Sequence, residues 1–370
     1  MNVPGRIVRR WHEWRNRSPS SSPDVPTSIS DLPANHLTDD LPGIEPSIGV
    51  VASDDIPNAE PLPGAPAFCI LSTDNHMEKI EMIAKSTTVV GQGEYIYEPD
   101  PTWGRRKGGV PWFGVSQGVA CDSKDRVYVF QRSPVACVLI FSRNGKLRDS
   151  WGFGRFKHPH GIWFNDEDQI FMTDRDTHLV TKWTSDGRFL KSWGTANAPG
   201  APGDPFNEPT KAFETDDGEI YVSDGYGQFR MHRFNKKGDL VRSWGEKGTG
   251  PSQFALPHDV IVDSRDRVLA CDRENDRVQI FDRAGDFQSE WTDMKRPMQL
   301  VEKDEVLYIA QAAFAVSVLD LDGKSLSSWE YKSTTPREAN APHSIAVDSR
   351  GDIYIGEVTG EDGLRKFIRQ

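Results

Sequence analysis

The chain of 370 residues carries a net charge of −11, with 44 Lys and Arg against 55 Asp and Glu. We expect no nucleic-acid partner, because an acidic chain has no basic excess with which to displace counterions from phosphates. No run of 18 apolar residues occurs, so no membrane-spanning helix is expected. Glycine (32), tryptophan (11) and phenylalanine (18) are abundant while long helix-forming runs are scarce, which favours an all-β fold of short strands and tight turns.

Residues 1–66 are predicted to form a disordered or loosely packed N-terminal extension. Residues 17–66 are rich in Ser, Pro and Asp and lack hydrophobic periodicity, so they cannot bury enough apolar surface to offset the entropy lost on ordering. The Arg- and Ser-rich start lacks the apolar core of a secretory signal, which leaves a basic surface tail or a cleaved organellar peptide as alternatives. A short helix is expected at residues 74–85.

From Ala67 onward the chain repeats one pattern of strand, acidic turn, strand and glycine-containing hairpin. The acidic turns stand in CDSKDRVYVFQR, FNDEDQIFMTDR, ETDDGEIYVSDG, VDSRDRVLACDR, EKDEVLYIAQ and VDSRGDIYIGE. A period of about 40–50 residues containing four strands is typical of a β-propeller, in which each blade buries a face that it cannot cover alone. Five complete copies and a truncated sixth predict a six-bladed β-propeller in residues 67–370.

The ring is expected to close through strands from both ends of this domain. The sixth copy begins at Pro342 and ends without the Trp-containing fourth strand of the other copies. We expect the missing strand to come from residues 87–100, TTVVGQGEYIYEPD. A seven-bladed ring or an open solenoid is the alternative, but the sequence contains no seventh acidic turn.

The four cysteines are scattered along the chain without CxxC or any other metal-ligand spacing. They are Cys69, Cys121, Cys137 and Cys271. Scattered cysteines in a chain of this size are typical of free thiols in a reducing compartment, so we expect a cytoplasmic protein.

Three Pro-His pairs occupy the same position in repeats 2, 4 and 6. Each histidine stands 14 residues before an acidic residue at the end of the second strand: His160 before Asp174, His258 before Asp272, and His343 before Glu357. Alternate blades of a six-bladed ring are related by about 120°, so the three side chains are expected to converge on the channel axis. Three neutral imidazoles with an open position are a catalytic metal arrangement, and zinc suits them best. Another divalent transition metal is the alternative, because imidazole also binds Fe, Co and Ni.

The competing interpretation is that each histidine packs or caps a turn. Three histidines in one register favour a shared site over three separate turns. His158, His178 and His232 lack this register and are interpreted as surface or packing residues.

The ends of the second strands are expected to bring four more side chains to the same mouth of the channel. These are Arg132, Arg175, Tyr226 and Arg273. A guanidinium can bind a carboxylate through two hydrogen bonds and stabilise negative charge on an oxygen, and a phenol near a cation can act as a base. We expect Arg132 and Arg273 to act on a substrate and Arg175 to form an inter-blade ion pair.

At these residues the sequence resembles the peptidyl-α-hydroxyglycine α-amidating lyase family, six-bladed propellers with NHL-like repeats. The family's histidine motifs are similar to HPHGI, LPHDV and APHSI, its tyrosine motif to VSDGY, and its arginine motifs to VFQR and DREN. The resemblance spans roughly residues 95–370. It implies zinc at His160, His258 and His343, with Tyr226 as catalytic base. It also implies that Arg132 and Arg273 lie near the carboxylate and hydroxyl of the substrate.

The sequence departs from this family at two places. Secreted members have disulfides where Gly227 follows Tyr226 and where Cys271 is expected to face Ile280, so their absence fits a cytoplasmic relative. The family also has an acidic residue after its third histidine that helps to hold a structural calcium. Ser344 stands there, which argues against calcium.

The sequence therefore predicts a metal-dependent carbon–nitrogen lyase that converts an N-acyl- or peptidyl-α-hydroxyglycine to an amide and glyoxylate. The substrate is expected to be a small molecule or peptide with a carboxylate; no copper monooxygenase domain is recognisable, which leaves another carbinolamide-like molecule as an alternative. A second hypothesis is a metal-dependent lactonase or esterase, a class that usually holds calcium with carboxylate or Asn ligands. A third is a non-enzymatic NHL-type interaction module, since the fold alone does not fix function.

Overall fold

The computed structural model describes residues 89–106, 109, 112–312, 314–331, 342–358 and 363–370. The extension expected at residues 1–66 and the helix expected at 74–85 lie outside the described residues. Within them, the regular structure consists of strands and one 3-10 helix, η2 (Arg273–Asn275).

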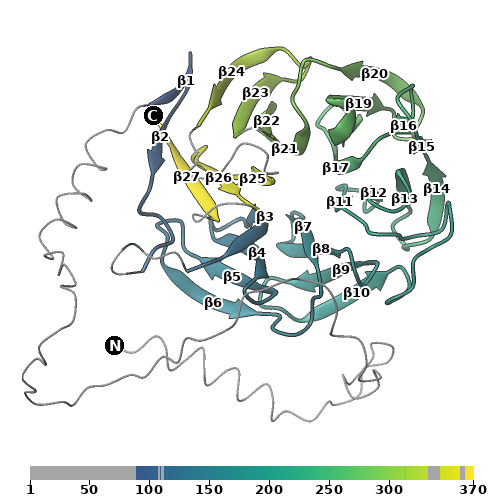
Figure 1. The fold of residues 1–370 in the computed structure, drawn as a ribbon, viewed down its shortest axis with the longest axis horizontal. Coiled ribbons are helices and arrows are strands. Elements are labelled where there is room, and N and C mark those ends of the chain that lie inside the picture. The colour runs from purple at the N-terminus through teal and green to yellow at the C-terminus, as the bar shows by residue number, and fades with distance from the viewer. Residues whose placement is uncertain (1–88, 107–108, 110–111, 313, 332–341, 359–362) are drawn as a thin grey trace, which may run out of the picture. The chain divides into compact units, whose positions relative to one another are not determined.

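Six antiparallel sheets surround a central channel as the blades of a propeller (Figure 1). Blade 1 consists of β3 (Val115–Cys121), β4 (Val127–Ser133), β5 (Cys137–Phe141) and β6 (Leu147–Trp151). Blade 2 consists of β7 (Pro159–Phe164), β8 (Gln169–Asp174), β9 (Leu179–Thr184) and β10 (Phe189–Trp193). Blade 3 consists of β11 (Lys211–Glu214), β12 (Ile220–Asp224), β13 (Arg230–Phe234) and β14 (Leu240–Trp244).

The other half of the ring has the same arrangement. Blade 4 consists of β17 (Pro257–Val262), β18 (Val268–Asp272), β19 (Arg277–Phe281) and β20 (Phe287–Trp291). Blade 5 consists of β21 (Pro297–Lys303), β22 (Val306–Gln311), β23 (Ala315–Asp320) and β24 (Ser325–Glu330). Blade 6 consists of β25 (Ser344–Val347), β26 (Ile353–Gly356), β27 (Leu364–Arg369), β2 (Tyr95–Asp100) and β1 (Val90–Gln92). A small parallel pair, β15 (Glu246–Lys247) and β16 (Gln253–Phe254), joins blades 3 and 4. The prediction of an all-β, six-bladed propeller is confirmed.

The acidic turns of the repeat fix the hairpin between the first and second strands of a blade. The Oδ1 atom of Asp122 accepts a hydrogen bond from the backbone N–H of Arg126 at 2.8 Å, so the side chain closes the turn. The same bond to the backbone four residues on is made by Asn165, Asp263 and Asp348. These turns set the register of the innermost strands, which line the channel.

The tryptophan that ends a fourth strand packs against a hairpin glycine of the next blade. Gly187 of blade 2 has a φ of 87°, and a Cβ there would lie 2.6 Å from the ring of Trp151 in blade 1. Later blades repeat this contact between Gly285 and Trp244 and between Gly323 and Trp291. The recurrence of Gly and Trp in the sequence therefore reflects one packing contact between neighbouring blades.

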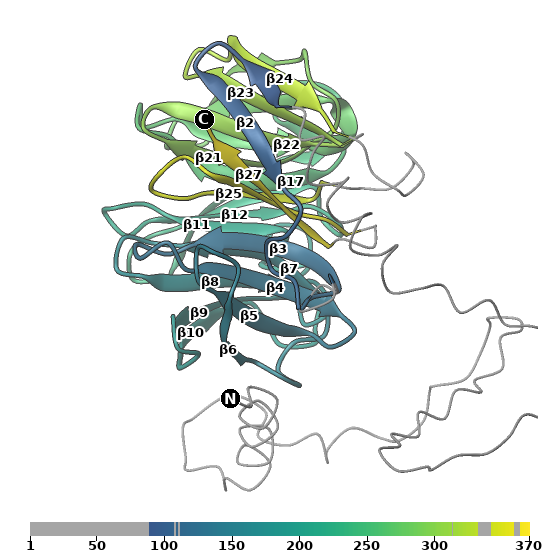
Figure 2. The ribbon, with the colours of Figure 1, turned by 90° about the vertical axis from the view of Figure 1, so that its left-hand side faces the viewer.

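Blade 6 closes the ring with strands from both ends of the propeller. β2 pairs with β27 in antiparallel register, with Tyr97 opposite Arg369, and Figure 2 shows these two strands side by side. The prediction that residues 87–100 complete the last blade is confirmed. The segment supplies two strands instead of the one predicted, because β1 and β2 form a hairpin through Gly93, whose φ is 61°.

Candidate metal centre and active site

The three histidines predicted to share a site lie together at one end of the channel, which we call the histidine mouth. His160 and His258 are the second residues of β7 and β17, and His343 directly precedes β25. One ring nitrogen of each histidine lies within 4.8 Å of those of the other two, and the side chains are only 2–4% exposed. Nitrogen ligands of a tetrahedral zinc with bonds of about 2.0–2.1 Å are about 3.3 Å apart, so a small inward shift of the rings would seat an ion.

Backbone carbonyls of the three intervening blades orient the imidazoles. The Nδ1 atom of each ring lies 2.7 Å from a carbonyl oxygen, in the pairs His160–Thr210, His258–Met298 and His343–Gln117. A carbonyl only accepts hydrogen bonds, so Nδ1 carries the proton and the Nε2 lone pair of each neutral ring faces its neighbours. Such a fixed tautomer is the usual support of a metal-binding histidine.

Burial keeps these imidazoles neutral. It lowers the pKa of His160 and His258 well below the usual range, and it lowers the pKa of His343 to about 3. The positive charge of Arg273 adds to the effect on His258 and His343. Neutral imidazole is the form that binds a metal ion, so the site is prepared for one at neutral pH.

Gln117 of blade 1 offers an independent test of whether a cation fits. Its amide Nε2 donates to Nε2 of His343 at 2.8 Å, while its Oε1 is buried without a hydrogen-bond partner. A buried carbonyl oxygen without a partner is costly, and a cation at the imidazole nitrogens is a group that this oxygen could turn toward. The donor set, three imidazole nitrogens and one nearby amide oxygen, therefore fits a divalent metal.

Tyr226 and Arg273 approach the same nitrogens. Tyr226 follows β12, and its phenol oxygen lies 3.3 Å from Nε2 of His160 and 3.4 Å from Nε2 of His258. Nη1 of Arg273, in η2, donates to this oxygen at 3.4 Å, and Arg273 is only 6% exposed. The structure thus brings five of the six predicted site residues into direct contact around one small space.

The sixth, Arg132 at the end of β4, is linked to the mouth through a residue that the sequence interpretation had set aside. Its Nη1 donates to Nε2 of His158 at 2.8 Å, and Nδ1 of His158 lies 3.3 Å from a carboxylate oxygen of Asp176. His158 therefore adjoins the candidate site through its contact with Arg132. Its position two residues before His160, on the same loop, is the one sequence signal that could have identified it.

Arg175 forms the expected ion pair, with Glu208 of the segment between blades 2 and 3. It also has a contact that its sequence position did not indicate. Its guanidinium carbon lies 3.6 Å from the ring centroid of Tyr226, a cation–π contact on the predicted base. The other two histidines outside the register, His178 and His232, make contacts away from the three-histidine cluster. Nδ1 of His178 accepts a hydrogen bond from the backbone N–H of Glu208, and buried His232 forms a hydrogen bond with Asp224.

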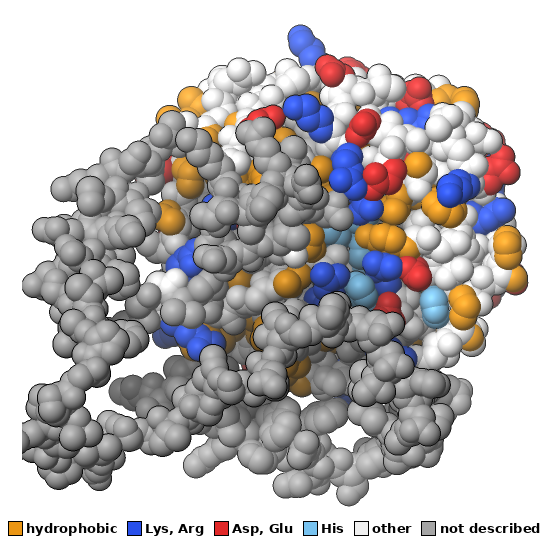
Figure 3. Space-filling model, viewed as in Figure 1, with side chains coloured by type: hydrophobic (Ala, Val, Ile, Leu, Met, Phe, Trp, Pro, Cys, Tyr) orange, Lys and Arg blue, Asp and Glu red, His pale blue; other side chains and the backbone are white. Residues whose placement is uncertain are grey.

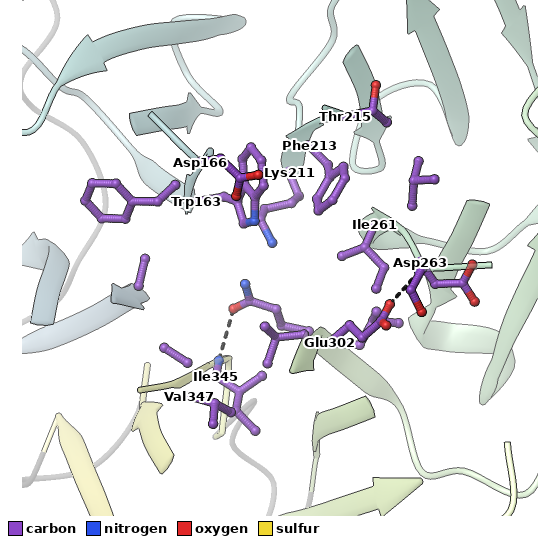
Figure 4. A pocket seen from close by; sticks show the side chains of 18 of the residues that line it. Trp163, Asp166, Lys211, Phe213, Thr215, Ile261, Asp263, Glu302, Ile345 and Val347 are labelled. Carbon is purple, nitrogen blue, oxygen red and sulfur yellow. Dashed lines mark hydrogen bonds between the residues drawn. The ribbon is translucent and has the colours of Figure 1, made fainter. Parts of the chain in front are cut away.

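A cavity of about 580 Å³ lies at the opposite end of the channel. Figure 4 shows its wall, which includes Trp163, Phe213 and Ile261 from the far ends of the innermost strands. Lys211, which lines this cavity, forms a buried ion pair of 2.9 Å with Asp259. We place the candidate site at the histidine mouth because, within the described ranges, the three histidines are the one side-chain group with metal-ligating geometry.

The cysteine expectations differ from the structure in one detail. Cys121, Cys137 and Cys271 are free, as predicted, and Cys69 lies outside the described residues. Cys271 was expected to face Ile280, which is wrong: it pairs with Val278, because the β18–β19 connection through η2 sets the register two residues earlier.

Comparison with known proteins agrees with the fold and with the repeat. The profile of the NHL repeat matches residues 254–281. NHL repeat-containing protein 3 of Mus musculus is 30% identical over 278 residues, which cover 69% of this chain and 80% of that protein. A gluconolactonase structure from Xanthomonas campestris has a TM-score of 0.54 at 13% identity and covers 74% of this chain and 90% of its own, a likeness of fold alone.

Amidating enzymes match over a smaller share of their own length. Peptidyl-alpha-hydroxyglycine alpha-amidating lyase 1 of Drosophila melanogaster is 34% identical over 186 residues, 46% of this chain and 34% of that protein. Peptidylglycine alpha-amidating monooxygenase of Rattus norvegicus is 27% identical over 72% of this chain and 32% of that protein. The described residues contain no helix long and apolar enough to cross a membrane. The chain belongs to the family of NHL repeat-containing proteins, and it is similar to the amidating lyases over part of their length.

Proposed function

We propose that the protein is a metal-dependent lyase that breaks the carbon–nitrogen bond of an N-acyl- or peptidyl-α-hydroxyglycine and releases an amide and glyoxylate. One observation carries the proposal: the phenol oxygen of Tyr226 lies 3.3 and 3.4 Å from imidazole nitrogens of the three-histidine cluster. A base and a metal-ligating set at this separation can act on one hydroxyl group.

Zinc is the metal we propose for His160, His258 and His343, held through their Nε2 atoms. When bound there, it would act as a Lewis acid toward the α-hydroxyl group of the substrate and favour loss of its proton.

The residues of the chain would divide the remaining work. Tyr226, acting as the phenolate, accepts the hydroxyl proton at its oxygen and becomes a phenol, and Arg273, which donates to that oxygen, stabilises the negative charge that develops nearby. The C–N bond then breaks as the C=O bond of glyoxylate forms. The proton returns from Tyr226 to the departing amide nitrogen, so no net proton is consumed. Arg132 binds the substrate carboxylate.

A second candidate is a non-enzymatic interaction module. It is favoured by NHL repeat-containing protein 3, 80% of which is covered by the match to this chain. We also propose a cytoplasmic location, because the three cysteines of the described part are free thiols.

Metal analysis of the purified protein, combined with glyoxylate release from N-acetyl-α-hydroxyglycine, tests the proposal. We expect about one zinc per chain and glyoxylate formation that stops when a chelator removes the metal. Zinc without glyoxylate, together with turnover of a lactone or ester, would replace the lyase with a hydrolase. Absence of both metal and turnover would favour the interaction module.

A further inference from the structure

Positive charge gathers at the histidine mouth of a protein whose net charge is −11. In Figure 3, histidine and Lys or Arg side chains lie beside one another near the centre of the face. Arg132 donates to His158, Arg175 stacks on the ring of Tyr226, and Arg273 donates to the Tyr226 phenol oxygen. Three guanidiniums around one small space repel one another, so each is stabilised either by an acidic side chain of the protein or by a bound anion.

Two of the three guanidiniums have such partners. Arg273 forms an ion pair with Glu274 at 2.8 Å, and Arg175 forms one with Glu208. Arg132 forms no ion pair among the described residues. Burial and the charge of nearby Arg175 lower the pKa of Arg132, which shows that its charge is poorly compensated.

Arg132 is nevertheless held in a fixed position. Asp176 lies 3.3 Å from Nδ1 of His158, so Nδ1 can carry the proton and leave Nε2 to accept the hydrogen bond of 2.8 Å from Nη1 of Arg132. This bond occupies one nitrogen of the guanidinium. Within the described residues Nε and Nη2 of Arg132 have no hydrogen-bond partner, and these two atoms form the edge that binds a carboxylate in a bidentate pair.

Arg175 adjoins His158, the residue that holds Arg132. Its backbone N–H donates to the carbonyl of His158 at 3.1 Å, so the residue that orients Arg132 also adjoins Arg175. The Arg175 side chain uses Nε and Nη2 for Glu208, which leaves Nη1 without a partner in the described part of the chain. Its stacking on the Tyr226 ring at 3.6 Å keeps that nitrogen near the predicted base.

We propose that Arg132 and Arg175 together bind the carboxylate of the substrate, with His158 and Glu208 as positioning residues. This rests on the proposed function for the identity of the anion as an α-carboxylate. It assigns Arg273 a different task, since Arg273 contacts the phenol oxygen where the hydroxyl group reacts. Two guanidiniums that are fixed by separate partners would discriminate strongly between a carboxylate and its neutral ester or amide.

The test measures binding without turnover. N-acetylglycine and its neutral amide, N-acetylglycinamide, both lack the hydroxyl group, and their affinities for the zinc-supplemented protein can be measured by isothermal titration calorimetry. We expect the parental protein to bind N-acetylglycine more tightly. Arg175→Met should weaken N-acetylglycine about tenfold, equal to about 1.4 kcal/mol, and leave N-acetylglycinamide unchanged.

The controls separate recognition from folding. Arg188→Met removes the same charge from an exposed turn between β9 and β10 and should alter neither affinity. Arg175→Lys keeps the charge and should retain part of the preference for N-acetylglycine over N-acetylglycinamide. Glu208→Gln should lose part of this preference while its zinc content stays unchanged. Parental affinity of Arg175→Met for N-acetylglycine would overturn the proposal, as would an equal loss for both probes or a parental protein without preference. An Arg175-dependent preference in a protein that releases no glyoxylate would instead refute only the lyase.

Discussion

Removal of one oxygen atom, in Tyr226→Phe, tests the lyase most directly. The phenol oxygen contacts Nε2 of His160 and of His258 and Nη1 of Arg273 at 3.3–3.4 Å, so the variant loses its base but keeps the ring on which Arg175 stacks. Loss of a positioned base lowers the rate by about 10²–10⁴. At about 1.36 kcal/mol per tenfold change, this equals about 3–5 kcal/mol of transition-state stabilisation.

The assay is glyoxylate release at saturating N-acetyl-α-hydroxyglycine, with zinc content and melting temperature measured on the same preparation. We expect kcat to fall by this factor while zinc content and melting temperature stay close to the parental values. Tyr221→Phe is the matched control in the same blade, because the Tyr221 hydroxyl donates to the backbone oxygen of Arg283 at 2.9 Å, away from the mouth. That variant should lose about 1 kcal/mol of stability and no activity. A parental kcat in Tyr226→Phe would refute the assigned base even with zinc present.

Three further outcomes follow from the packing and the metal site. Alanine in place of any one of His160, His258 and His343 should remove most of the bound zinc, whereas His178→Ala, outside the register, should retain it. Equal zinc content in all four variants would show that the three histidines do not share a metal site. Gly187→Ala should lower the free energy of unfolding in urea by about 1–3 kcal/mol, because its Cβ would lie 2.6 Å from Trp151. Gly203→Ala, at a φ of 97° with open space around it, should cost less, and an equal cost would show that backbone strain alone matters. Lys211→Met should lower the free energy of unfolding in urea by about 3–5 kcal/mol, because it leaves the carboxylate of Asp259 buried without its ion-pair partner. The double variant Lys211→Met with Asp259→Leu should recover much of this loss in the same measurement.

Residues that recur at the same position of several repeats could be predicted from the sequence, whereas contacts made by a single loop could not. The three histidines could be found because a 14-residue spacing recurs in alternate blades, and the closing strand could be found because one copy lacked its Trp. The carbonyls of Thr210 and Met298 that orient the rings leave no trace in the sequence, because every residue has a carbonyl group. The contacts of His158 and Arg175 depend on the path of single loops, which no repeat specifies.

At the proposed metal site, metal binding and closure of the ring would be thermodynamically linked. Each imidazole belongs to one even-numbered blade and is oriented by a carbonyl of an odd-numbered neighbour, so the three ligands keep their positions only while neighbouring blades stay packed together. A ligand that binds only the closed ring raises its stability with concentration, by about 2.7 kcal/mol at 100 times the dissociation constant. A zinc ion at the proposed site would therefore stabilise the ring that strands from both ends of the propeller close, and removal of the metal should lower the free energy of unfolding as well as the proposed activity.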